Sequence, residues 1–296
     1  MKISHLKTYL KVASTKSFTR AAQDLFMTQP TVTNHIQSLE QELGYQLIVR
    51  SSFGIRLTAK GEELLQKISE IFRLIDELKN DTETQDNGIC GTLNIAASSV
   101  MGTHFLTPIL KATLEKYPNI DIRLHFGTAY SIATWVQDGF VDLGFAPRSP
   151  GFQRLNFTSL LVEPCIIAIS TSQYAPCRME LDQGDLSGQR FILREKGTQA
   201  HDRAIRWLKK QAWHTSMRTP IILSDMESIK NLVLEGAGMT IIPRCCVKKH
   251  IEQGSMKEIK PNIPVGIINY FMIERLNEND SSIISIFKKM LLQDEK

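Results

Sequence analysis

Apolar residues recur at helical spacing in three short segments at the start of the chain, near residues 6–13, 18–25 and 32–43. The third segment follows Thr28, a capping residue, and Pro30, which suits a first helical turn. Its buried stripe would be Val32, Ile36, Leu39 and Leu43, and Gly44 is a stop signal. The break FMTQ separates it from the second segment, which Ser17 can cap. The pattern predicts a three-helix head with two helices joined by a short turn.

The face opposite this stripe is polar and carries no Lys, Arg, Asp or Glu from Gln29 to Leu39. A rotation of about 100° per residue places Pro30, Asn34, Gln37 and Gln41 there, with Thr33 at the flank. Asn and Gln can bond adenine in a bidentate manner, and a Thr methyl group can pack on thymine. The alternative is an ordinary solvated face, but such faces usually carry Lys and Glu. The composition favours a helix that reads DNA.

Two apolar runs, Leu47–Arg50 and Ile55–Leu57, flank SSFG and predict a hairpin with Gly54 in its turn. Such a hairpin would be the wing of a winged helix-turn-helix, with Arg50 and Arg56 contacting phosphate. Thr58 then caps a predicted long helix with a heptad-like stripe of Gly61, Leu64, Ile68, Ile71, Ile75 and Leu78. That stripe favours a coiled coil with a second copy. The alternative is a helix lying on its own domain. The polar segment ETQDNG from Glu83 predicts a hinge.

From Gly91 onward, strand patterns alternate with helical ones, which predicts an α/β fold with parallel sheet and helices on both faces. Ligands in such folds bind beyond the carboxyl ends of the strands, where helices present free N–H groups. Hydroxyls and glycines recur at those ends, as in Ser98, Ser99, Thr128 and Thr198. They are either simple helix caps or the lining of a site for a small polar or anionic ligand.

The net charge of the whole chain, +4, says little about function, but its distribution along the chain is informative for the head. Residues 1–60 hold eight Lys/Arg against three Asp/Glu, and residues 61–87 hold three against eight. A basic head suits the phosphate backbone of DNA. No apolar run approaches the roughly 18–20 residues that span a bilayer, and no signal peptide is recognisable. Five cysteines without a CxxC pair fit a reduced cytoplasmic protein.

The stretches SFTRAAQDLFMTQPTVTNHIQSLEQELGYQLIVR and RLTAKGEELL resemble the LysR-type transcriptional regulators. The later pieces GTLNIAASSVMGTHFLTPIL, FGTAYSIATWVQDGFVDLGFA, FILREKGTQAHDRAI and VLEGAGMTIIP resemble that family's effector domain, which is similar to periplasmic solute-binding proteins. The family often has a basic residue at the position of Asn34. The resemblance covers residues 1–293 and implies a regulator that binds double-stranded DNA.

The resemblance implies a winged helix-turn-helix domain over residues 1–58, a linker helix and hinge over 59–88, and an effector domain over 89–296. Its first subdomain would span about 91–161 and 266–296, and its second about 162–265. The residues expected at DNA are Thr28, Gln29, Pro30, Thr31, Thr33, Asn34, Gln37, Arg50, Arg56 and Thr58. Those expected at the effector are Ser98, Ser99, Thr103, Thr128, Pro147, Arg194 and Thr198.

The family resemblance also implies self-association as a dimer or tetramer, contact with RNA polymerase, and no membrane partner. It does not identify the effector. The family's peroxide sensors carry a reactive Cys after the Gly of the segment matching EKGTQAH, whereas Thr198, Gln199 and Ala200 stand here, so redox sensing is not expected. Cys165 and Cys246 are expected to be small buried apolar residues.

Catalysis and metal binding have no local signal in the chain. None of the seven histidines pairs with a His or Cys at a ligand spacing, so no metal and no cofactor are expected. No phosphate loop, GxSxG elbow or HExxH occurs. Two further interpretations remain open, a solute-binding protein whose head is an interaction module and an enzyme on the same scaffold.

Overall fold

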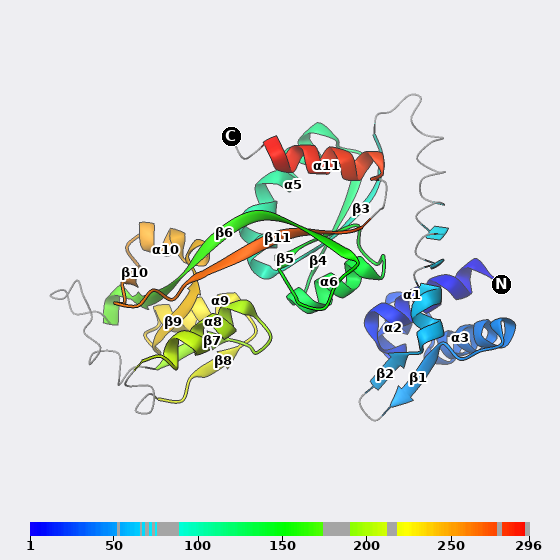
Figure 1. Ribbon diagram of the computed structural model, residues 1–296, viewed down its shortest axis with the longest axis horizontal. Helices are drawn as coiled ribbons and strands as arrows, with labels where there is room; N and C mark the ends of the chain where they lie inside the picture. Colours follow the sequence, from blue (N-terminus) through cyan, green and yellow to red (C-terminus); the bar gives the residue numbers. More distant parts are fainter. Residues whose placement is uncertain are drawn as a thin grey trace.

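The computed structural model describes residues 1–51, 54–65, 67, 68, 71, 72, 75, 89–173, 190–211, 218–276 and 280–293. It shows a small N-terminal head and a larger α/β part in which two long strands, β6 and β11, run from one subdomain into the other (Figure 1). Within the described residues, no helix is long and apolar enough to cross a membrane.

The head is built from the three helices that the spacing predicts, followed by a β-hairpin. Its elements are α1 (Ile3–Thr15), α2 (Phe18–Asp24), α3 (Gln29–Leu43), β1 (Ile48–Ser51) and β2 (Gly54–Leu57). Ser17 caps α2 by accepting a hydrogen bond from the N–H of Arg20, and Thr28 caps α3 by accepting one from Thr31. The predicted stripe of α3 is buried at Val32, Ile36 and Leu39 against α1 and α2.

The hairpin differs from the prediction at its turn. Gly54 begins β2 and pairs with Ser51, so it lies in the strand and not in the turn. Both predicted runs form strands, but β1 begins and ends one residue later than Leu47–Arg50 and β2 begins one residue earlier than Ile55, which adds the pair Ser51–Gly54 to the ladder. Residues 52 and 53 lie outside the described residues.

The helix after the hairpin begins where Thr58 predicts, because the Thr58 Oγ1 accepts a hydrogen bond from the N–H of Gly61 at 2.9 Å. Leu65 and Ile68 are buried in the core of the head, whereas Ile71 is 39% exposed. The first turns of the stripe therefore pack on their own domain, and Ile71 faces outward. Leu78 and the predicted hinge from Glu83 lie outside the described residues.

The α/β part holds one continuous sheet in the order β4-β3-β5-β11-β6-β9-β7-β8, with β10 paired to β6. The strands are β3 (Gly91–Ala97), β4 (Ile120–Phe126), β5 (Leu143–Pro147), β6 (Leu155–Ser170), β7 (Phe191–Arg194), β8 (Ile221–Leu223), β9 (Met239–Pro243), β10 (Met256–Ile259) and β11 (Ile267–Arg275). The expectation of a parallel sheet holds for β3 with β4 and β5, and for β7 with β8 and β9. It is wrong for β6 and β11, which pair antiparallel with each other and with their other neighbours.

The helices and a few short helical turns lie around this sheet (Figure 1). They are η1 (Met101–Leu106, a π-helix), α5 (Thr107–Lys116), α6 (Ala129–Gln137), α8 (Gln199–Leu208), α9 (Met226–Leu234), α10 (Lys248–Glu252) and α11 (Ser282–Gln293), with the 3-10 turns η2 (Thr171–Gln173) and η4 (Arg244–Cys246). We call β3–β5, η1, α5, α6 and α11 the first subdomain, and β7–β10, α8–α10 and η4 the second. The two crossing strands β6 and β11 connect them.

Candidate effector pocket and nucleic-acid interface

The outer face of α3 is available for a partner. Gln29, Asn34 and Gln37 are exposed, as the rotation about the buried stripe predicts. The amides of Asn34 and Gln37 make no hydrogen bond within the described part of the chain, whereas that of Gln29 accepts a 3.4 Å bond from Thr19. Free amides next to a helix N-terminus can donate to and accept from base edges.

The threonines of this surface are already engaged locally. The hydroxyls of Thr28 and Thr31 lie 2.8 Å apart, and that of Thr33 donates to the Gln29 carbonyl at 3.0 Å. Thr58 donates to the Gln46 carbonyl at 2.7 Å while capping its helix, so its hydroxyl proton is not free for phosphate. The Thr58 hydroxyl therefore has a structural role, and its contact with DNA stays a prediction.

Of the other residues expected at DNA, some are exposed and one has a side chain outside the described residues. Arg56 is exposed on β2, Pro30 is exposed in the first turn of α3, and the side chain of Arg50 lies outside the described residues. Sequence reasoning missed Phe26, which is 98% exposed in the turn between α2 and α3 with a φ of 54°. Its signal was the FMTQ break itself, since an apolar residue in a short exposed turn has no core to join.

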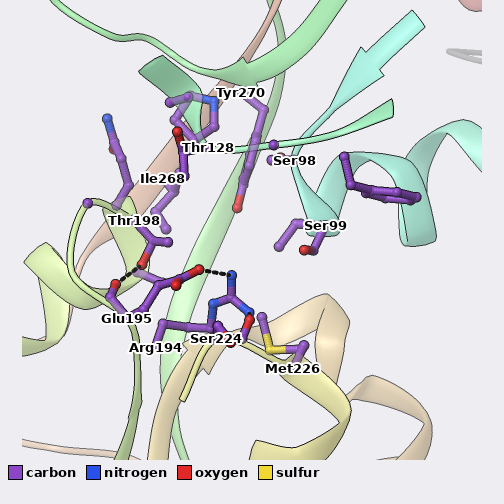
Figure 2. A pocket seen from close by; sticks show the side chains of 18 residues that line it. Ser98, Ser99, Thr128, Arg194, Glu195, Thr198, Ser224, Met226, Ile268 and Tyr270 are labelled. Carbon is purple, nitrogen blue, oxygen red and sulfur yellow. Dashed lines mark hydrogen bonds and ion pairs between the residues drawn. The ribbon is translucent and has the colours of Figure 1, made fainter. Parts of the chain in front are cut away.

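A pocket of about 260 Å³ lies between the two subdomains, beside the crossing strand β11. Six of the seven residues predicted for the effector line it: Ser98, Ser99, Thr128, Pro147, Arg194 and Thr198. They come from the ends of β3, β4, β5 and β7, which the fold brings together as the strand-end argument predicts. Figure 2 shows Ser99 on one side of this space and Arg194 and Thr198 on the other.

Thr103 does not line this pocket. It lies in η1 beside a shallow groove with Leu110, Leu124 and Phe126, and its carbonyl accepts a hydrogen bond from the Thr107 hydroxyl at 3.0 Å. The π-helical winding after Ser99 carries position 103 to the outer side of the first subdomain, so the prediction for Thr103 is wrong.

Residues of β11 complete the pocket, and sequence reasoning missed them. Ile268 and Tyr270 line it together with Glu195 and Met226. The phenol of Tyr270 is 2% exposed, and burial raises its pKa, so it stays a neutral hydrogen-bond donor. Tyr270 lies in the middle of a strand, where strand-end reasoning does not look. An extended β11 crossing between subdomains is the feature that brings it into the pocket.

Several helix N-termini converge on the pocket. Thr128 caps α6, Thr198 caps α8, and Asp225, between the lining residues Ser224 and Met226, caps α9. Each cap satisfies an N–H in the first turn, which leaves other first-turn N–H groups without a helical partner. The two interpretations of these hydroxyls are therefore compatible, because capping residues can also line a site. The converging amides make the pocket favourable for negative charge.

Charge inside the pocket is balanced around Arg194, whose side chain is 11% exposed. Its Nη2 lies 3.5 Å from the Glu195 carboxylate, and its Nη1 donates to the Ser224 carbonyl. Hydrogen bonds from Ser228 lower the pKa of the nearby Asp225. The Ser98 hydroxyl is buried and has no hydrogen-bond partner among the described residues. A polar ligand in the pocket could supply the hydrogen bond that this buried hydroxyl lacks.

The cysteines are not all equivalent. Burial raises the pKa of Cys165 to about 12, as expected of an inert buried thiol. Cys246 is also buried, but a hydrogen bond from Cys245, helped by His104, lowers its pKa below the ordinary value of a thiol. Both cysteines are buried, as expected. Cys246 differs from Cys165 because its thiol has hydrogen-bonding neighbours that favour the thiolate.

A winged helix-turn-helix joined to a two-subdomain part with a pocket between the subdomains defines a DNA-binding regulator that responds to a small ligand. Residues 3–62 match the family described as "Bacterial regulatory helix-turn-helix protein, lysR family", and residues 86–294 match "LysR substrate binding domain". The chain belongs to the LysR family of transcriptional regulators.

Curated relatives agree with this assignment over most of the chain. The HTH-type transcriptional regulator CysL of Bacillus subtilis is 25% identical over 270 residues, which covers 91% of this chain and 87% of that protein. The DNA-binding transcriptional dual regulator OxyR of Escherichia coli is 25% identical over 250 residues, covering 83% and 80%. The relatives are transcriptional regulators, so the chain is a regulator and not an enzyme.

Solved structures show the same fold. A full-length OxyR variant from Pseudomonas aeruginosa aligns with a TM-score of 0.67 at 18% identity, covering 98% of this chain and 94% of that one. CbnR, a LysR family transcriptional regulator, aligns with a TM-score of 0.63 at 22% identity over 100% of both chains. These likenesses confirm the predicted winged helix-turn-helix and two-subdomain architecture.

Proposed function

We propose that the effector of this regulator is a small anion, such as a carboxylate or an oxyanion, held in the pocket between the subdomains. The observation that carries the proposal is the convergence of the α6 and α8 N-termini with Arg194 on one cavity of about 260 Å³. Glu195 neutralises part of the Arg194 charge, so the helix termini and the unpartnered Ser98 hydroxyl supply the remaining recognition.

Matched pairs of anions and neutral analogues test this directly. Thermal unfolding of the full chain would be followed with acetate against acetamide, benzoate against benzamide, and with sulfate and phosphate. We expect at least one anion to raise the midpoint while its neutral analogue does not, because only the anion gains from the helix termini. Ser98→Ala should weaken that shift, and Arg123→Ala, an exposed change on the outer strand β4, should leave it unchanged.

Stabilisation by amides as strong as by the matching anions would overturn the anionic class. The absence of any shift across the series at millimolar concentration would count against a small-anion site.

We also propose that α3 reads bases through Gln29, Asn34 and Gln37, while Arg56 contacts phosphate. Asn34→Ala should cost about 1–3 kcal/mol of discrimination between the operator and random DNA. Arg56→Ala should weaken binding to both DNAs. It should also lower the slope of log affinity against log salt by about 0.9 for each phosphate that Arg56 neutralises. Fluorescence anisotropy over a salt series measures both effects.

Gln41→Ala is the matched control, since Gln41 lies on the same face of α3 but about 10 Å further along the axis, at 1.5 Å per residue. Its binding should be unchanged. Equal losses on operator and random DNA for Asn34→Ala would contradict base reading.

We further propose that the protein associates with a second copy of itself, acts in the cytoplasm and contacts RNA polymerase. The exposed Ile71, beyond the part of the linker stripe that packs on the head, supports pairing of linker helices from two copies. A paired chain would place two heads on two half-sites of one DNA. A regulator of this kind would act in the cytoplasm, where DNA and RNA polymerase are found. The effector would change the arrangement of the heads only if it binds one arrangement better.

A further inference from the structure

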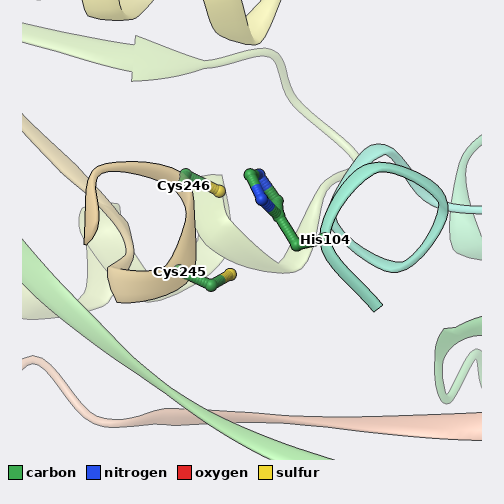
Figure 3. Close-up of side chains that lie close together, drawn as sticks. All are labelled: His104, Cys245 and Cys246. Atoms are coloured by element: carbon green, nitrogen blue, oxygen red, sulfur yellow. The ribbon is translucent and has the colours of Figure 1, made fainter. Parts of the chain in front are cut away.

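His104, Cys245 and Cys246 come together at a second place between the subdomains (Figure 3). His104 lies in η1 of the first subdomain, and the two cysteines lie in η4 of the second. One imidazole nitrogen and both sulfurs all lie within 4.8 Å of one another. Figure 3 shows both thiols directed toward the imidazole ring.

This donor set is chemically specific. Two sulfurs and one imidazole nitrogen favour thiophilic ions of filled d shell over magnesium or calcium, which prefer oxygen. Bond lengths of about 2.3 Å to sulfur and 2.0–2.1 Å to nitrogen place tetrahedral ligand atoms about 3.5–3.8 Å apart. The present separations, which are at most 4.8 Å, need to shorten by no more than about 1.3 Å. His104 is exposed, so its side chain can move that far without disturbing the core.

The surroundings hold the cysteine pair in position. The Glu163 carboxylate accepts a hydrogen bond from the backbone N–H of Cys245 at 2.7 Å, which ties η4 to the crossing strand β6. Cys246 is 4% exposed and Cys245 is half-buried, so the sulfurs lie at the inner end of the site and the imidazole at its open end.

We propose that His104, Cys245 and Cys246 bind one thiophilic cation of the Zn²⁺ or Cu⁺ class, which bridges the two subdomains. The protein supplies three ligands, and a fourth position stays open to water or another donor. Each thiol that is protonated loses its proton on binding. Because the ligands come from both subdomains, the ion holds η1 and η4 at a fixed separation.

The site is independent of the proposed anion but adjoins its pocket. Tyr270 lines that pocket and also lies within electrostatic reach of both sulfurs. If the ion favours one separation of the subdomains, it changes the affinity for the pocket ligand, and the ligand changes the affinity for the ion by the same factor. Metal binding is nevertheless measurable without any effector.

Titration of the full chain with Co²⁺ under a non-thiol reductant tests the site. The background is a Cys90→Ser/Cys177→Ser variant, which removes the other thiols except the buried Cys165. We expect one Co²⁺ per chain, with the sulfur charge-transfer and visible d–d absorption of tetrahedral thiolate coordination. Zn²⁺ should displace Co²⁺, and magnesium should not.

His104→Ala is the decisive variant, because an exposed side chain can be removed without unfolding the protein. It should weaken Zn²⁺ binding on the order of a hundredfold, as loss of a ligand or its support typically does. It should also abolish the rise in unfolding midpoint that Zn²⁺ gives the parent. His250→Ala, on the neighbouring α10, should change neither.

Two results from metal binding, and one from hydrogen exchange, would overturn the proposal. One is the absence of charge-transfer absorption in the parent. The other is Zn²⁺ affinity that survives His104→Ala undiminished, which would leave a cysteine site within the second subdomain and no bridge. Hydrogen exchange that slows at η4 but not at η1 when Zn²⁺ binds would contradict the bridge in the same way.

Discussion

The backbone conformation of Phe26 suits its side chain poorly. It adopts a φ of 54° in the turn between α2 and α3, and it is 98% exposed. The left-handed region costs a residue with a Cβ roughly 1–2 kcal/mol, and Asn tolerates it far better. Full exposure means that the phenyl ring gains no burial that would offset this strain.

Phe26→Asn should therefore stabilise the head by about 1 kcal/mol. Hydrogen exchange of the buried amides of α1 and α3 in the full chain would measure the gain as slower opening. Met27→Asn is the matched control, since Met27 has an ordinary negative φ and should gain nothing. Faster exchange in Phe26→Asn would show that the ring makes a contact in solution that stabilises the turn.

Residues that are near in the sequence were predictable, and residues that are distant were not. The capping roles of Ser17 and Thr28 and the polar face of α3 follow from local spacing, and the structure confirms the caps and the exposure. The approach of His104 to Cys245 and Cys246 has no such spacing. Only the packing of η1 against η4 across the subdomains creates it.

At the scale of elements, Gly61 fixes how the linker helix meets the head. A Cβ at this position would lie 2.3 Å from the Leu47 carbonyl oxygen and 2.8 Å from the Tyr9 hydroxyl. The carbonyl belongs to the backbone beside the wing and cannot rotate away. The close approach explains in physical terms why a glycine stands in the first turn of this helix.

Gly61→Ala should destabilise the head by about 1–3 kcal/mol, as overpacking typically does. That loss exceeds the gain of about 1 kcal/mol that Ala gives in a helix. Hydrogen exchange of β1 and the linker helix would report it. Lys60→Ala, one position earlier and exposed, should change stability by less than about 0.5 kcal/mol. A stabilised Gly61→Ala variant would mean that the helix can shift away from the wing.

Elements with one clear period were predicted well, and those without one were missed. The helix α3 begins directly after Thr28 and ends directly before Gly44, as its stripe and the two flanking residues predict. The first half of β6, the short β10 and the five-residue α10 were missed. In the first half of β6, exposed and half-buried residues alternate irregularly, because that stretch crosses between subdomains and is not covered on one constant face.

At the scale of the whole molecule, the crossing strands decide where function can lie. β6 and β11 pair with each other along their shared length, and their register shifts between Tyr270 and Phe271. The pocket and the His-Cys-Cys cluster both lie where elements of the two subdomains meet near these strands. A ligand at either place therefore contacts both subdomains at once, which is the arrangement a switch needs.

The same pair of strands also has a consequence for how such a protein can change over generations. The second subdomain lies between Pro164 and Ile267, and these two residues face each other in the ladder. A segment whose two ends meet can be replaced as a cassette, and the seam consists mainly of backbone hydrogen bonds that do not depend on side chains. Recombination at this seam would give a chimera with new ligand preferences. The head and its operator would stay the same.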